Sequence, residues 1–317
     1  MNDWKQTQFG KEYDAFRQEL DDYYAAYPTD VSALEQELDE KSRLQPQAGA
    51  MEKKTWIYEL AAEKCRVKLF RHCPFYFEVD TGAPRNLAGS CFPPIPGLGS
   101  WLMRRDTSGL EQEFQNWIAP YVQEDALNST MYVDCAHHAM GVGNVLRYGL
   151  RGLQRQAQAR LQTETDVEKQ TFLRCVIRAV MRLCARFADE AERLCGTERD
   201  PVVQARLARI AISARRCPAE PAETFFEALN TMLLLKELGN GLESMGFAIL
   251  GHVDRVLAPY YARDVQLGRL TAAQAQELVY WFCAMTDAKW DLSQALYGTN
   301  TAMSIGGCDE NGTPVFN

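Results

Sequence analysis

Two adjacent histidines are the side chains of this sequence that could most readily move a proton near neutral pH. His137 and His138 lie in the segment DCAHHAMGVGNVLRYGL. An imidazole donates or accepts a proton in this range, so His137 could take part in proton transfer. The alternative is a hydrogen-bonded structural histidine, which is the favoured role for His138. We expect no metal site at this pair.

Ten cysteines are the other potentially reactive side chains. They include no C-x-x-C pair, which argues against a structural zinc site because such sites draw on closely spaced ligands. Cys175, Cys184 and Cys283 lie among apolar residues, where a cysteine usually acts as a small buried hydrophobe. The N-terminal segment lacks the basic and then apolar order of a secretory signal. We therefore expect a cytoplasmic protein without a disulfide framework.

Composition narrows the class of protein. The chain has 317 residues, of which 46% are hydrophobic and 24% charged, as in an ordinary globular protein with a sizeable core. A net charge of −8, without a basic stripe interleaved with aromatic residues, argues against nucleic acid as a partner. The arginines at 147, 151, 155 and 160 have helical spacing, and we interpret them as a solvated helix face. No apolar run has the length of a membrane span.

The elements that would position these side chains are mainly helices. Apolar residues at helical spacing predict helices over residues 4–27, 32–44, 51–70, 108–122, 141–161, 165–194, 202–215, 218–238, 244–262 and 271–288. Pro218 and Pro221 are expected to begin the helix over 218–238, and Gly239 and Gly241 to end it. Thr271, with Gln274 three residues later, predicts a capping box.

Strands are expected at two places. Residues 75–79 alternate between apolar and polar side chains, and residues 302–305 are short and apolar before a Gly306-Gly307 turn. Residues 130–135 could form a further strand or a loop. We interpret residues 81–106 as a long loop whose apolar side chains pack against the surface of the protein.

Four segments near the C-terminal end resemble, in the same order, motifs of the glycyl radical enzymes, the family of pyruvate formate-lyase and its dehydratase and lyase relatives. They are PAETFFEAL, GHVDRVLAPYYARD, LTAAQAQELV and SIGGCDENG. The second is similar to the family pattern G-R-x-D-x-x-L/M-x-P-Y-Y-x-x-D. The resemblance implies an α/β, helix-rich fold, namely the N-terminal portion of a ten-stranded barrel surrounded by helices. Residues 1–317 would form one incomplete domain of this kind, ending before the family's cysteine and glycine loops.

The resemblance also implies where the chemistry would come from. Family members use a cysteine on one barrel loop and a glycyl radical on another, which an S-adenosylmethionine-dependent activase installs. None of the ten cysteines corresponds to the first, and the glycine motif R-V-x-G-Y is absent from the sequence. We therefore expect no catalytic residue, bound cofactor or activity in this chain alone. In the full-length enzyme the resemblance implies a homodimer, an activase partner and a small polar substrate.

Three residues are predicted to line the substrate pocket by the same resemblance. His137 corresponds to the histidine that dehydratase members place against a substrate hydroxyl. Phe247 lies in a stretch, residues 245–248, where dehydratases often read N-G-H-S, and Asn300 replaces a tryptophan of pyruvate formate-lyase. These departures argue against pyruvate as the substrate. His252 replaces the arginine of G-R-x-D, so Asp254 is expected to lose an ion-pair partner.

Two other interpretations belong to different classes. A stand-alone, non-catalytic helical binding or scaffolding protein could be derived from the same fold. An unrelated helix-rich ligand-binding domain is the third, and the ordered motifs argue against it. If the radical-enzyme interpretation holds, strand 302–305 lacks its barrel neighbours, and we expect the isolated chain to associate or to be poorly soluble.

Overall fold

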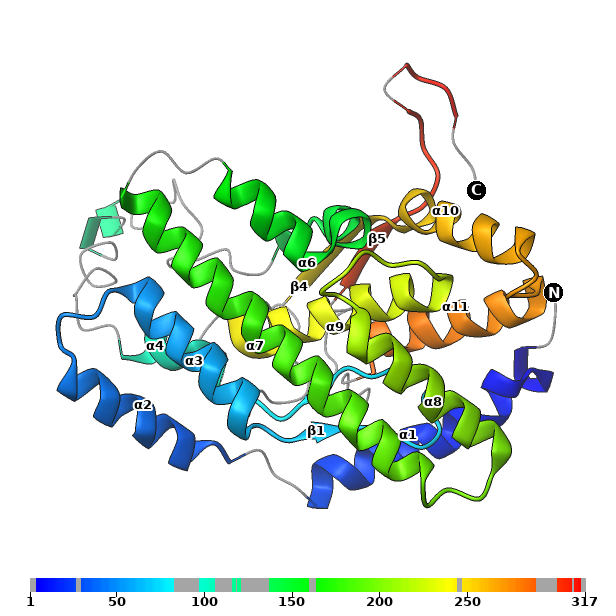
Figure 1. The fold of residues 1–317 in the computed structure, drawn as a ribbon, viewed down its shortest axis with the longest axis horizontal. Coiled ribbons are helices and arrows are strands. Elements are labelled where there is room, and N and C mark those ends of the chain that lie inside the picture. Colours follow the sequence, from blue (N-terminus) through cyan, green and yellow to red (C-terminus); the bar gives the residue numbers. More distant parts are fainter. Residues whose placement is uncertain are drawn as a thin grey trace.

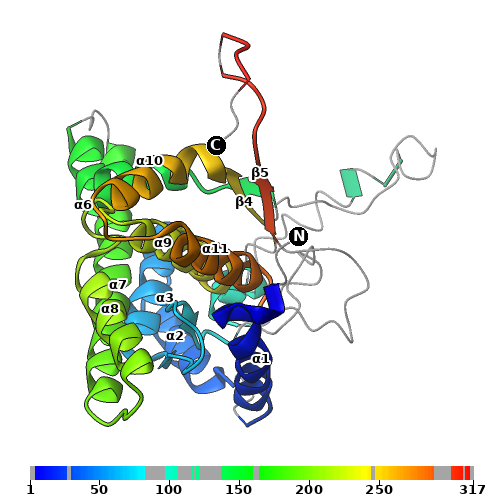
Figure 2. The same cartoon turned by 90° about the vertical axis from the view of Figure 1, so that its right-hand side faces the viewer.

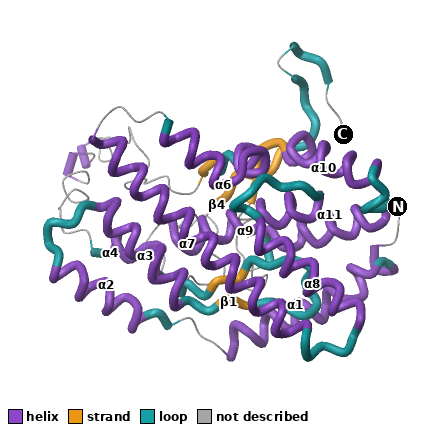
Figure 3. The backbone as a smooth tube through the Cα atoms, viewed as in Figure 1, coloured by secondary structure: helices purple, strands orange, loops and turns teal. Residues whose placement is uncertain are grey.

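A computed structural model describes residues 4–26, 30–82, 97–105, 116–117, 119–120, 137–159, 164–243, 247–288, 301–309 and 311–314, with only the backbone described at 103, 137, 138, 164–166 and 247. Helices make up most of this part of the chain, and the strands form two small groups (Figure 3). Among the described residues, no helix combines the length and the apolar character needed to cross a lipid bilayer.

The described elements follow one another in a largely helical order. They are η1 (Trp4–Gln6), α1 (Gln8–Ala26), α2 (Ser32–Leu44), α3 (Ala50–Lys64), β1 (Val67–Lys68), β2 (Glu78–Val79), η2 (Leu98–Ser100), α4 (Trp101–Arg104), β3 (His137–Ala139), α6 (Val142–Gln158), α7 (Glu164–Cys195), α8 (Pro201–Arg216), α9 (Phe225–Glu243), β4 (Phe247–His252), α10 (Val253–Gln266), α11 (Ala272–Thr286) and β5 (Thr301–Ser304).

Helix α9 lies at the centre of the molecule and is buried along almost its whole length. The long helix α7 crosses in front of it in Figure 1, with α8 beside α7. Figure 2 shows α7 and α8 on one side, α9 and α11 in the middle, and β4 and β5 towards the other side. Apolar residues occur on several sides of α9, which is typical of a core helix, although Glu227, Asn230 and Lys236 are also buried.

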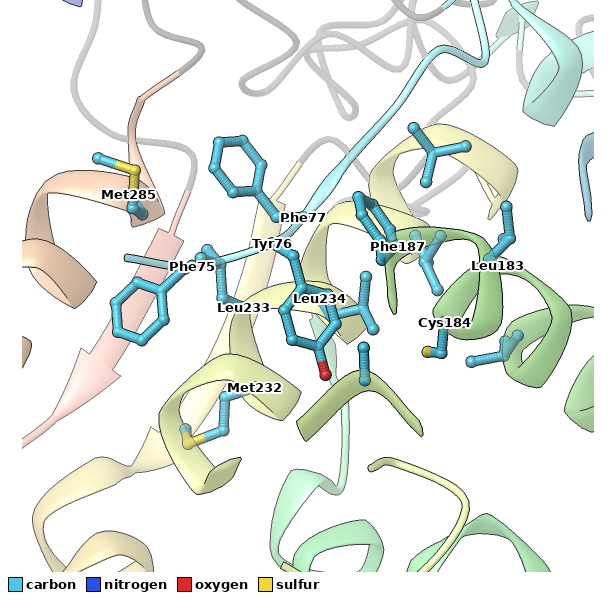
Figure 4. Close-up of a cluster of buried hydrophobic side chains, with 14 of the residues drawn as sticks. Phe75, Tyr76, Phe77, Leu183, Cys184, Phe187, Met232, Leu233, Leu234 and Met285 are labelled. Atoms are coloured by element: carbon cyan, nitrogen blue, oxygen red, sulfur yellow. The ribbon is translucent and has the colours of Figure 1, made fainter. Parts of the chain in front are cut away.

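An extended aromatic segment joins the central helices. Phe75, Tyr76 and Phe77 are almost completely buried among side chains of α7, α9 and α11 (Figure 4). Asn230 of α9 accepts a hydrogen bond from the amide of Tyr76 and donates one to its carbonyl, both at 3.0 Å. Because Asn230 is fully buried, these two bonds satisfy polar groups that would otherwise destabilise the core.

The strands near the C-terminal end form a three-stranded parallel sheet in the order β3-β4-β5. Parallel neighbours need long crossover connections, which are supplied here by α6–α9 and by α10–α11. Between Ile249 and His252 the pairing of β4 with β5 shifts by one residue, and Gly251 takes a φ of 74° inside this irregularity. A separate antiparallel pair joins β1 to β2.

Several predicted elements agree with the structure. The helices over 4–27, 32–44, 165–194, 202–215 and 271–288 correspond to η1 with α1, α2, α7, α8 and α11. Asp200 accepts a hydrogen bond from the amide of Val202, and both bonds of the Thr271–Gln274 capping box are present. Strand 302–305 corresponds to β5, which is shifted by one residue and ends at Ser304.

The helix predicted over 244–262 was wrong in its first half. Residues 247–252 form β4, and α10 begins at Val253. The spacing of the apolar residues Phe247, Ile249 and Leu250 fits a helix or a strand. The segment is a strand because it pairs with β3 on one side and β5 on the other.

The boundaries predicted for α9 were also wrong. It begins at Phe225, after the two prolines, and continues through Gly239 and Gly241 to Glu243. A Cβ at Gly241 would lie 2.7 Å from Oγ1 of Thr81, so this glycine permits close packing and does not end the helix.

Three further predictions were wrong or fall partly outside the described residues. The helix predicted over 51–70 ends at Lys64, and within 75–79 the structure pairs Glu78 and Val79. Of the predicted loop 81–106, residues 98–104 are helical and 83–96 lie outside the described residues. Residues 130–135 and most of 108–122 also lie outside them.

Candidate functional site

The parallel sheet brings two of the three predicted pocket residues together. His137 of β3 is the register partner of Phe247 of β4, and these are the first residues of their strands. The side chains of both residues lie outside the described part of the structure, and so does Asn300 altogether. Thr301, which follows Asn300 in the sequence, pairs with Ala248. The backbone therefore supports a shared location for 137 and 247, while the role of all three residues stays a prediction.

The two faces of this sheet differ in burial. Ala248 and Leu250 are at most 2% exposed, and Thr301 is also buried. The residues paired across the other face are exposed or half-buried, namely Ala139, Ile249 and Ala302. Since side chains alternate along a strand, one face packs against the helices and the other is less covered.

Two neighbouring residues of α10 hold the turn that follows β5. The carboxylate of Asp254 accepts a hydrogen bond from the amide of Gly306 at 2.6 Å. The guanidinium of Arg255 donates to the carbonyls of Gly306 and Cys308, at 2.9 and 2.8 Å. The amide of Gly306 lowers the pKa of Asp254, with Arg255 and His252 contributing through their charges. Arg255 acts on Asp254 through its backbone amide and its charge, and the expected loss of an ion-pair partner for Asp254 stays a prediction.

Arg255 was not among the predicted site residues, because its contacts to the turn span 51 and 53 residues of sequence and depend on tertiary structure. Gly307 has a φ of 88°, and a Cβ there would lie 3.3 Å from Nη2 of Arg255. The close approach of Arg255 to the turn thus depends on glycine.

The tight turn after Cys308 is organised by one carboxylate. Asp309 accepts hydrogen bonds from the amides of Asn311 and Thr313, both at 2.9 Å, which lowers its pKa. Cys308 and Pro314 form an antiparallel bridge across the turn. The predicted turn chemistry of Asp309, Asn311 and Gly312 is thereby confirmed, with Gly312 at a φ of 78°.

The last aspartate of the GHVDRVLAPYYARD segment has a structural function. Asp264 is 4% exposed and accepts a hydrogen bond from the amide of Phe225, the first residue of α9, at 2.8 Å. It thus satisfies a donor that the helix itself leaves unpaired. This contact ties α10 to the central helix, and α10 in turn carries Asp254 and Arg255.

Most of the described cysteines are unreactive because burial keeps their thiols protonated. Burial raises the pKa of Cys65, Cys73 and Cys217 to about 12 and raises that of Cys184 further. A thiol with such a pKa is not a thiolate at neutral pH. Cys283 and Cys308 are exposed, which for Cys283 differs from the expected burial. Within the described part of the chain, no three His, Cys, Asp or Glu residues are grouped so that they could hold a metal ion.

The most apolar groove lies away from the start of the sheet. It encloses about 540 Å³ between α9, α10, α11 and the end of β5, where Leu229, Leu257, Phe282, Met303 and Ile305 line it. The described residues that line this groove are mostly apolar.

Curated proteins similar to this chain include lyases and dehydratases. Isethionate sulfite-lyase of Desulfovibrio desulfuricans is 31% identical over 145 residues, which are 43% of this chain and 17% of the relative. (2S)-3-sulfopropanediol dehydratase of Klebsiella oxytoca is 27% identical over 157 residues, which are 47% of this chain and 19% of the relative. The aligned parts are thus a small fraction of the length of these relatives.

Solved structures show the same fold over a larger share of this chain. A glycyl radical enzyme from Archaeoglobus fulgidus matches 89% of this chain and 42% of its own, with a TM-score of 0.65 and 19% identity. A structure concerned with 1,2-propanediol dehydration in Roseburia inulinivorans matches 88% and 39%, with a TM-score of 0.70 and 16% identity. This chain therefore spans less than half of each structure.

A family model described as pyruvate formate lyase-like matches residues 101–317, well over half of the chain. The parallel sheet, the central helix and the turn at Gly306 lie within or beside this range. The chain belongs to the pyruvate formate lyase-like family of glycyl radical enzymes and corresponds to the N-terminal part of those proteins.

Proposed function

We propose that residues 1–317 form one wall of the substrate pocket in a glycyl radical lyase or dehydratase that acts on a small polar substrate other than pyruvate. The single observation that carries the proposal is the register pairing of His137 with Phe247. It supports a common location for two positions that the sequence assigns to the pocket. The similar proteins, isethionate sulfite-lyase and (2S)-3-sulfopropanediol dehydratase, support the reaction class.

The proposed function of His137 is to move a proton at the departing group. Every second residue of a strand lies on the same face of the sheet. Positions 137 and 247 therefore belong to the face that contains Ala139 and Ile249, and this face is the less covered one. An imidazole near its ordinary pKa can protonate a leaving hydroxyl and then be reprotonated from solvent. Asn300, whose neighbour Thr301 pairs with β4, would add an amide that can donate or accept a hydrogen bond.

The hydrogen-abstracting groups would come from outside these residues. The sequence of residues 1–317 contains no R-V-x-G-Y motif and no cysteine that corresponds to the family's cysteine loop. A glycyl radical installed by an S-adenosylmethionine-dependent activase would supply the radical chemistry. We further propose a homodimer in the cytoplasm as the working form of the full-length enzyme.

The test begins with the protein as its source makes it. We expect mass spectrometry of anaerobically purified material to find residues 1–317 in a polypeptide or complex that also carries the cysteine and glycine loops. Incubation with the activase and S-adenosylmethionine should then give a glycyl radical signal in electron paramagnetic resonance, and small diols or sulfonates can be screened as substrates. A folded 317-residue protein without such loops, in the chain or in a partner, would refute the proposal.

The alternative is a non-catalytic helical binding or scaffolding protein derived from this fold. The observation that favours it is the continuous buried core around α9, most of which is made by helices and not by the β3-β4-β5 sheet. A monodisperse, cooperatively unfolding monomer of residues 1–317 would support this alternative.

A further inference from the structure

A groove between α6 and α7 is lined by arginines from both helices. It encloses about 680 Å³, and the cationic residues on its walls are Arg151, Arg155, Arg174, Arg178 and Arg182. None of the described residues that line it is acidic. Such a concentration of one charge is unexpected in a chain with a net charge of −8.

The spacing of these arginines arranges them in two rows. Arg151 and Arg155 are one helical turn apart on α6, and Arg174, Arg178 and Arg182 follow one another at the same interval on α7. Helices α6 and α7 run in opposite directions in Figure 1, and the short segment 159–163 separates them in the sequence. The sequence had indicated a solvated face on α6, whereas the structure places a second arginine row beside it.

Part of this charge has no compensating carboxylate. Arg151 pairs with Glu220 at 2.8 Å and Arg178 with Glu59 at 2.6 Å. Among the described residues, Arg155 and Arg182 have no ion-pair partner. Like charges that face one another repel, so the groove gains free energy when an anion enters it.

The side-chain type and the floor of the groove restrict the anion further. Every cationic side chain in the lining is arginine, whose planar fork can donate two hydrogen bonds to one phosphate group. Gln154 and Gln158 add neutral donors, while Ile177 and Met181 make the lining partly apolar. Successive arginines in a row are about 6 Å apart along the helix axis, so an anion with several linked phosphates can reach more than one of them.

We propose that this groove binds a compact polyanion of the polyphosphate class, such as inorganic tripolyphosphate or the diphosphate group of a nucleotide. The rows on α6 and α7 donate hydrogen bonds to the phosphate oxygens from two sides. The site does not depend on the proposed radical chemistry, because it lies on helices outside the β3-β4-β5 sheet and its readout is binding.

Calorimetric titration of the 317-residue chain with tripolyphosphate at low ionic strength tests this site. We expect saturable binding that weakens as salt is added, because screening reduces the attraction. The double substitution Arg155→Gln and Arg182→Gln should weaken binding by about tenfold to a hundredfold, since charge-assisted hydrogen bonds are lost. The double substitution removes no ion pair of the described residues. The thermal midpoint of the protein should therefore stay the same or rise. Titration with a nucleoside diphosphate then shows whether the apolar part of the lining accepts a base.

The matched control is Arg43→Gln with Arg263→Gln, which removes the same charge from exposed positions on α2 and α10. The control should bind within about twofold of the unchanged protein. Absence of saturable binding, or an equal loss in both double variants, would overturn the proposal. So would an acidic peptide such as poly-glutamate that binds more tightly than tripolyphosphate, since the groove would then recognise a polypeptide.

Discussion

Single side chains of α10 connect the sheet, the turn at Gly306 and the central helix. Asp254 and Arg255 hold the turn through backbone groups, and Asp264, at the other end of the helix, caps α9. The acidic positions of the family-like segment GHVDRVLAPYYARD are thus explained by hydrogen bonds to backbone amides of distant segments. The guanidinium that contacts the turn at Gly306 belongs to Arg255.

A substitution of His137 separates a chemical function from a structural one. In an activated enzyme that contains this chain, His137→Gln should reduce turnover about a hundredfold or more, the range expected for loss of a positioned acid or base. The thermal midpoint should change little, because glutamine keeps a hydrogen-bonding group of similar size. Steady-state rates and thermal unfolding are measured on the same preparation.

The control for this experiment is His72→Gln. Nδ1 of His72 lies 3.3 Å from the carboxylate of Glu19, so this histidine has a structural contact. The control should alter stability slightly and leave turnover unchanged. An equal loss of turnover and stability in the His137 variant would show that His137 is structural.

At the scale of elements, α6 contains a kink that depends on a single glycine. Gly149 has a φ of 66°, and a Cβ there would lie 2.5 Å from the carbonyl oxygen of Ala219. Gly149→Ala should therefore lower the free energy of unfolding by about 2–4 kcal/mol, through backbone strain and a clash with main-chain atoms. Denaturant titration measures the change.

Gly143 in the same helix provides the comparison. A Cβ at this position meets only ordinary van der Waals contact, 3.7 Å from Val256. Gly143→Ala should be neutral or raise the free energy of unfolding by up to about 1 kcal/mol, because alanine favours the helix. If both alanines had the same effect, the kink at Gly149 would not be a required feature.

The first turn of α9 should make stability depend on pH. Burial opposes the charged form of Glu227, but the guanidinium of Arg216 and the amides of Glu223 and Thr224 outweigh it and lower its pKa. A lowered folded-state pKa stabilises the protein above the unfolded pKa of about 4.3, and this stabilisation is lost as the pH falls through the folded-state pKa.

The substitution Glu227→Gln isolates this contribution. At pH 7 the variant should be less stable by about 1–3 kcal/mol, because the bidentate contact with Arg216 is weakened. The difference between the two proteins should shrink as the pH falls below about 4. Unfolding free energies measured from pH 7 to pH 3 check this, and a difference that did not vary with pH would contradict the assignment.

Hydrophobic periodicity was sufficient to predict the long helices and those with clear caps. Long amphipathic helices such as α7 and helices with clear caps such as α11 were predicted within a few residues. The strand β4 was missed because its six residues include apolar side chains that fit either period, and its pairing partners lie far away in the sequence. Of the candidate site, the sequence predicted His137, Phe247 and Asn300, whose roles stay predictions. It did not predict Arg255, whose contacts depend on tertiary structure.

At the scale of the whole molecule, an exposed apolar surface remains at the end of the sheet. Ile305 is 74% exposed and borders the groove between α9, α10, α11 and β5. We predict that residues 1–317 associate through this surface and that Ile305→Lys reduces the association. Sedimentation velocity over a range of concentrations measures it.

The control is Ile212→Lys on α8, whose side chain is 71% exposed but lies outside this groove. This variant should associate as the unchanged chain does. A monodisperse monomer of the unchanged chain at all concentrations would contradict the prediction.

The parallel arrangement of β3, β4 and β5 has a consequence for how the chain reaches this structure. Residues 140–246 separate the first two strands, so their pairing closes a long loop, whereas the neighbouring helices α7 and α8 meet across a short turn. Local contacts form quickly and distant ones slowly. During synthesis the helical layer should therefore assemble first, and the strands that carry His137 and Phe247 should come together last. Amide exchange after a short refolding pulse would then protect α7 before β4.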